Sequence, residues 1–194
     1  MKMAKKFLAV ALAGVLALSV LTGCANSVKS KDVADSLTKM GIKVEQSKDV
    51  DKTAKSTLTA IEAIINSETN TGADKVTLEN AVVAADGKVI KTNTITDNTN
   101  KVQKALGVFA NGSDAEKAND GKKVQVALVK TEDAKKDASL QAYRVKEGLV
   151  QVKAVTVDND HKFAETGKLG IAKTSDGKYI LVVIINDVVE KANG

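Results

Sequence analysis

The segment that most constrains the fold is the run of seven consecutive apolar residues at 179–185, YILVVII. A strand with one face in water alternates apolar and polar residues, so this run predicts a central strand that is covered on both faces. The sequence TSDG at 174–177 supplies a turn before it, and Leu169 and Ile171 precede that turn. Together these segments predict a β-hairpin at the centre of a sheet.

More strands are expected from the same half of the chain. The apolar and polar alternation at 124–128 is typical of a half-buried strand. Residues 140–145 and 149–157 predict two further strands. The pair Asp86-Gly87 between apolar runs predicts another hairpin, and the arm before it also fits a helical turn.

Helices are predicted in the N-terminal half, where apolar residues recur at intervals of three and four. One helix is expected to begin near Lys31, with Ser30 as its N-cap and Gly41 just beyond its end. A longer helix is predicted over 48–67, and another one begins near residue 102. Helices followed by strands indicate an α+β fold, with N-terminal helices packed on an antiparallel sheet built mainly from the C-terminal half.

The chain begins with a basic and then an apolar segment. Three lysines precede the apolar residues 7–20, a run shorter than the ~20 residues that span a bilayer. The run ends in Leu21-Thr22-Gly23-Cys24. This pattern resembles the signal peptide of bacterial lipoproteins, whose lipobox reads Leu, a small residue, Gly or Ala, and Cys. The resemblance covers residues 1–26 only.

The resemblance implies that residues 1–23 are removed and that Cys24 becomes a diacylglyceryl-modified N-terminus. Two acyl chains hold a protein on a membrane stably, whereas one chain does so only marginally. We then expect 24–31 to be a lipidated tether and 32–194 a single α+β domain, at the extracytoplasmic face of the cell membrane. The other interpretation is an ordinary secretory signal peptide that carries a cysteine near its end.

Composition excludes some partners. Removal of residues 1–23 takes away three lysines, so the formal charge falls from +5 to +2. Nucleic-acid surfaces combine arginine clusters with stacking aromatic residues, but Arg144 is the only arginine in the sequence. The aromatic residues after Gly23 are Phe109, Tyr143, Phe163 and Tyr179. No nucleic-acid partner and no cofactor are therefore expected, and a carbohydrate receptor is disfavoured.

The single histidine, His161, is the residue on which a Ser-His-Asp or Cys-His triad would have to be built. Asp158 and Asp160 lie beside it, and these three residues are the only metal-ligand candidates that the sequence offers. An EF-hand loop starting at Asp158 needs Gly at its sixth and Glu at its twelfth position, which hold Phe163 and Leu169. The expected structure is a solvated loop without a metal.

A second resemblance covers about 25 residues. Asp160-His161, the segment GKLGIA at 167–172 and DGKY at 176–179 are similar to the closing segment of bacterial CAP (SCP-like) secreted domains. In that family a histidine loop precedes an Ile-Gly-rich strand, a turn and a final strand. The family's cavity uses a second histidine and paired glutamates from earlier in the chain, and this sequence has one histidine.

These observations favour a membrane-anchored extracytoplasmic lipoprotein whose domain binds a protein or another envelope component without catalysis. The alternative is a small envelope hydrolase built on His161 or on an acidic pair, or a CAP-like secreted domain. A substrate-binding subunit of a transporter is disfavoured, because the 171 residues from Cys24 onward are few for two α/β lobes.

Overall fold

The structure is a computed structural model that describes residues 28–72, 75–79, 102, 105, 122–152 and 157–192. The signal segment 1–26 and the Asp86-Gly87 hairpin lie outside these residues, as does most of the helix predicted from 102 onward. Within that helix Val102 is helical and fully buried.

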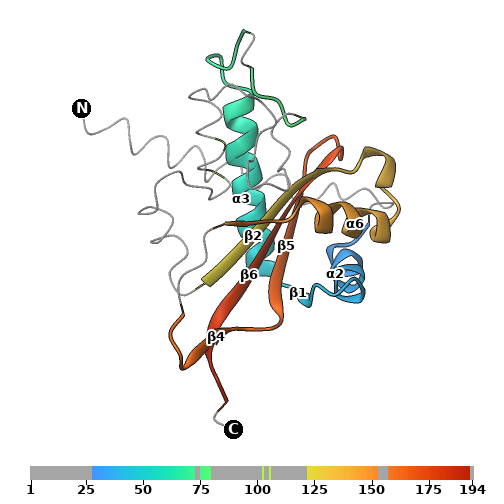
Figure 1. The fold of residues 1–194 in the computed structure, drawn as a ribbon. Coiled ribbons are helices and arrows are strands. Elements are labelled where there is room, and N and C mark those ends of the chain that lie inside the picture. The colour runs from blue at the N-terminus through green and yellow to red at the C-terminus, as the bar shows by residue number, and fades with distance from the viewer. Residues whose placement is uncertain are drawn as a thin grey trace, which may run out of the picture.

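The described residues form one mixed sheet of six strands in the order β1-β5-β6-β2-β3, with β4 paired to the far end of β6 (Figure 1). The parallel pair is β1 with β5, and the remaining pairs are antiparallel. The predicted α+β class and the C-terminal origin of most strands are confirmed. The strands are β1 Val44–Gln46, β2 Lys122–Lys130, β3 Val150–Val152, β4 His161–Phe163, β5 Gly167–Lys173 and β6 Tyr179–Glu190.

Strand β6 is the central strand that the apolar run predicts. It pairs with β5 on one side and β2 on the other, and its first six residues are all buried. Its side chains alternate between two cores, with Leu181 and Val183 in one and Val182 and Ile184 in the other. Both faces of the sheet are therefore covered by helices, and the fold has three layers.

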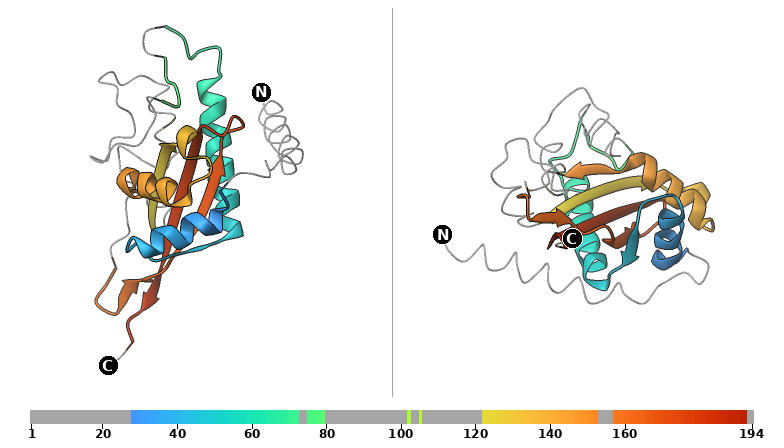
Figure 2. Two further views of the ribbon diagram at one scale, coloured as in Figure 1. Left: turned by 90° about the vertical axis from the view of Figure 1, so that its right-hand side faces the viewer. Right: turned by 60° about the horizontal axis from the view of Figure 1, so that its bottom comes forward.

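Helix α3, Lys48–Ile65, covers one face of the sheet (Figure 2). Ser47 caps it by accepting a hydrogen bond from the N–H of Val50 at 3.5 Å. Its apolar stripe packs on the sheet because residues three and four apart share one side of a helix. The buried residues of that stripe are Val50, Ala54, Leu58 and Ile61.

The opposite face is covered by α2, Ser30–Lys39, and α6, Ala138–Gly148 (Figure 2). Gly41 lies beyond α2 with φ +91°, and the N–H of Ile42 donates to Leu37 O at 3.0 Å. These features define a Schellman ending, which confirms the predicted role of Gly41. The predicted N-cap is wrong, because Lys29 occupies that position and Ser30 is already helical.

Helix α6 contradicts the strand that was predicted over 140–145. Asp137 caps the helix by accepting the N–H of Leu140 at 2.9 Å. The buried side is formed by Gln141, Ala142, Val145 and Gly148, which follow a helical and not an alternating spacing. The strand predicted over 149–157 is present at 150–152 as β3, and residues 153–156 of the predicted strand lie outside the described residues.

The boundary expected between tether and domain also changes. Val28 is only 9% exposed, and its N–H donates to Lys135 O at 3.3 Å. The carbonyl of Val28 accepts a hydrogen bond from Lys173 Nζ at 2.6 Å. Residues 28–31 therefore belong to the folded domain, and the segment between Cys24 and the domain is shorter than the predicted tether 24–31.

Candidate functional site

The structure brings Asp158 and His161 into direct contact. His161 is the first residue of β4, and its Nδ1 lies 2.6 Å from Asp158 Oδ1. The same carboxylate oxygen accepts the backbone N–H of Asp160 at 3.0 Å. The expected solvated loop is thus a short turn that leads into a strand. In the part of the chain that the structure describes, no group of three or more His, Cys, Asp or Glu side chains is placed to hold a metal ion.

The contact with Asp158 sets the charge state of His161. The hydrogen bond and the negative charge of Asp158 raise the pKa of the imidazole, and Glu190 and Asp160 add to this effect. The same contact lowers the pKa of the Asp158 carboxyl. An imidazole that acts on a nucleophile needs a hydroxyl or thiol within hydrogen-bond reach, and among the described residues its polar partner is the Asp158 carboxylate. The contact therefore holds the turn, as a hydrogen bond and, when the imidazole is protonated, as an ion pair.

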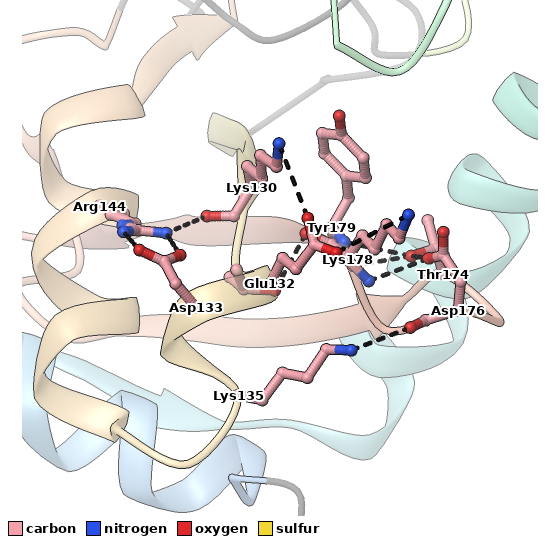
Figure 3. Close-up of polar contacts among 10 residues, drawn as sticks. Lys130, Glu132, Asp133, Lys135, Arg144, Thr174, Asp176, Lys178 and Tyr179 are labelled. Atoms are coloured by element: carbon pink, nitrogen blue, oxygen red, sulfur yellow. Dashed lines mark hydrogen bonds and ion pairs between the residues drawn. The ribbon is translucent and has the colours of Figure 1, made fainter.

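A larger polar network lies where β2 ends and where β5 turns into β6 (Figure 3). Arg144 of α6 binds both oxygens of Asp133, each at 2.5 Å, and also donates to Lys130 O at 2.8 Å. The pairing with Arg144 lowers the pKa of Asp133 to about 2. A carboxylate with such a low pKa accepts no proton near neutral pH. This ion pair is therefore a structural link between α6 and the end of β2.

The turn between β5 and β6 carries the other half of this network. Asp176 Oδ1 accepts hydrogen bonds from the Thr174 hydroxyl at 2.7 Å and from the Lys178 backbone at 2.9 Å, which lower the pKa of Asp176. Glu132 lies 3.7 Å from both Lys130 and Lys178. Figure 3 shows these side chains around the end of the sheet. The carboxylates of this polar network are therefore engaged in ion pairs and in hydrogen bonds within the turn.

Burial shifts two groups beside this network. The pKa of Glu62 is raised mainly because α3 buries its carboxyl, and the charge of Asp176 adds to the shift. Burial likewise raises the pKa of Tyr179. Both groups keep a proton more strongly than usual; Tyr179 belongs to the apolar core, and Glu62 is a half-buried residue of α3.

A group of lysines surrounds Val28, and the sequence gives no indication of it. Lys29 follows Val28 in the chain, Lys135 O bonds to the Val28 N–H, and Lys173 Nζ bonds to the Val28 carbonyl. Lys136 follows Lys135. We call these four exposed residues, Lys29, Lys135, Lys136 and Lys173, the Val28 lysine cluster. They come from the N-cap position before α2, from the segment between η1 (Glu132–Ala134) and α6, and from the end of β5.

Cys24 and the lipobox residues Leu21, Thr22 and Gly23 lie outside the described residues. Within the described residues no helix has the length and apolar character to cross a membrane. No family model, no curated protein and no solved structure matches the chain.

Proposed function

We propose that this protein is a lipoprotein anchored through diacylglyceryl-Cys24 at the extracytoplasmic face of the cell membrane. Its domain binds a protein or another envelope component and does not catalyse a reaction. The observation that carries the proposal is Leu21-Thr22-Gly23-Cys24 directly after a basic and apolar leader. Two acyl chains on one residue give stable attachment without a transmembrane helix.

The arrangement of the titratable groups supports a binding role. The carboxylate of Asp133 is paired with Arg144, and that of Asp158 contacts His161, which carries a charge only when its imidazole is protonated. Glu132 is shared between Lys130 and Lys178. Groups held in this way stabilise the surface geometry on which a partner could dock.

Membrane fractionation with intact-mass analysis tests the anchor. Wild type is expected in the membrane fraction, with Cys24 as its first residue and the added mass of a diacylglycerol. Cys24→Ala is expected to lose that mass and to leave the membrane, while Thr22→Ser, which keeps a small residue in the lipobox, is the matched control and stays lipidated. A soluble wild type cleaved at another bond refutes the anchor and makes a freely secreted protein the leading explanation.

Cross-linking and an assay of hydrolysis test the domain. Amine-reactive cross-linking on intact cells is expected to give an adduct with an envelope component, and the adduct is expected to weaken in Cys24→Ala. Purified protein is expected to hydrolyse p-nitrophenyl acetate no faster than its His161→Ala variant. Hydrolysis that disappears in both His161→Ala and Asp158→Asn would support the envelope hydrolase instead.

A further inference from the structure

We propose that the domain sits on the membrane in one orientation, with the Val28 lysine cluster against anionic lipid headgroups. The inference rests on the proposed anchor at Cys24, and it goes further because it names the face of the domain that meets the lipid. Three observations carry it: the short connection to the domain, the exposed lysines at the point of connection, and the length of the sheet that extends away from them.

The connection between lipid and domain is short. Four peptide units join Cys24 to Val28, and an extended chain spans at most about 3.3–3.6 Å per residue, so the two residues are no more than about 14 Å apart. Val28 is fixed in the domain by its hydrogen bonds to Lys135 O and from Lys173 Nζ. The corner of the domain that contains Val28 is therefore held close to the headgroups.

The charge at this corner fits an anionic surface. Lys29, Lys135 and Lys136 are exposed, and among the described residues the ammonium group of Lys135 donates to the Asp176 carbonyl at 3.4 Å, at the turn between β5 and β6. The carboxylates nearest in the chain are already engaged, because Asp133 is paired with Arg144 and Asp137 caps α6. A lysine close to an anionic leaflet is attracted to its headgroups. Several such residues at the anchored corner favour one orientation over free rotation about the tether.

The opposite end of the sheet is far from this corner. Lys173 ends β5 next to the turn that leads into β6, whereas β4 pairs with the last residues of β6 (Figure 1). A strand rises about 3.3 Å per residue, so the ten steps from Tyr179 to Val189 extend over about 33 Å. Lys162 of β4, which pairs with Val189, is then expected to lie well above the membrane surface.

Fluorescence quenching on vesicles tests the orientation with the whole processed chain. One variant carries Ser175→Cys in the exposed turn between β5 and β6, and another carries Lys162→Cys in β4. Because the Cys24 thiol is acylated in the proposed form, a thiol-reactive fluorophore labels only the introduced residue. Vesicles of phosphatidylcholine with phosphatidylglycerol and a nitroxide-headgroup lipid are expected to quench the label at residue 175 strongly and the label at 162 weakly.

Charge reversal supplies the matched comparison. The variant with Lys29→Glu, Lys135→Glu and Lys136→Glu is expected to lose most of the difference in quenching, as is wild type in vesicles of pure phosphatidylcholine. Lys48→Glu, Lys122→Glu and Lys162→Glu reverse three exposed lysines toward the other end of the sheet and are expected to leave the 175 label quenched. Equal quenching at 175 and 162 in wild type, or an unchanged result after reversal of the cluster, overturns the orientation.

Co-sedimentation with the same vesicles separates the two proposals. If the chain sediments with vesicles and Cys24→Ala does not, the anchor holds and the quenching result bears on the orientation alone. If the wild-type chain does not sediment with vesicles, the anchor fails, and the proposed orientation fails with it.

Discussion

Replacement of Gly170 by alanine is expected to destabilise the domain strongly, because the first turn of α3 lies directly on this residue. A Cβ atom at Gly170 would overlap the carbonyl group of Val50 and the backbone nitrogen of Asp51. Gly170 does not have a positive φ, so the alanine backbone itself is unstrained. On conformational grounds alone, alanine in a strand interior would be expected to improve stability slightly. The structure predicts the opposite sign.

The expected loss in the free energy of unfolding follows from the contacts that α3 would lose. Overpacking of a well-packed core costs about 1–3 kcal/mol. Movement of α3 also breaks the hydrogen bond from the Ile171 N–H to Asp51 Oδ1, which is 2.8 Å long. A hydrogen bond to a charged group contributes about 1.5–3 kcal/mol. We therefore expect Gly170→Ala to lower the free energy of unfolding by about 3–5 kcal/mol, a large part of the roughly 5–15 kcal/mol of a typical domain.

Urea unfolding followed by circular dichroism, in the full chain with Cys24→Ala, measures this loss. Gly41→Ala is the matched control, because Gly41 has φ +91° and no heavy atom within 4 Å of an added Cβ. That control carries only the left-handed backbone penalty of about 1–2 kcal/mol. If Gly170→Ala is no less stable than Gly41→Ala, the close approach of α3 to β5 is refuted.

Two further predictions concern His161 and Asn70. The raised pKa of His161 in the fold means that its pair with Asp158 stabilises fully below the ordinary value of 6.5, and that this contribution is lost as the pH rises through the folded-state pKa. Asp158→Asn is expected to lower the His161 pKa toward 6.5, as followed by NMR of the ring protons; an unchanged pKa contradicts the pairing. Asn70 is 3% exposed and bonds to Ile65 O at 2.6 Å, to Val76 O at 2.8 Å and to Val76 N at 2.9 Å. Asn70→Ala is expected to destabilise by about 2–4 kcal/mol and to speed hydrogen exchange of the Val76 amide, whereas the exposed Glu68→Ala stays within about 0.5 kcal/mol of wild type.

The elements that the sequence predicts well are those whose burial follows one clear period. Helix α3 extends from Lys48 to Ile65 as expected within two residues, because its apolar residues repeat every three or four positions. Strand β6 is recognised because both of its faces are apolar. Helix α6 is missed because its buried side includes the polar Gln141, while the aromatic Tyr143 is 53% exposed. A buried polar residue and an exposed aromatic residue hide the helical period of apolar positions. The Asp137 N-cap is the signal that could have revealed the helix.

The candidate sites also differ in how far the sequence predicts them. The contact between Asp158 and His161 is local, and their neighbourhood in the sequence predicts it. The Val28 lysine cluster includes Lys29, Lys135 and Lys173. Lys29 is more than a hundred positions before the other two in the sequence, so no local pattern relates them. Its members meet only because β5 ends beside the start of α2.

The position of β6 has a consequence for biosynthesis. This strand is the last of the described strands to be made, yet it is the one to which β2, β4 and β5 all hydrogen-bond. A nascent chain that lacks residues 179–190 leaves β2, β4 and β5 without the strand to which all three hydrogen-bond. The sheet can therefore be completed only once residues 179–190 are available, and we expect the last step of folding to follow synthesis of this strand.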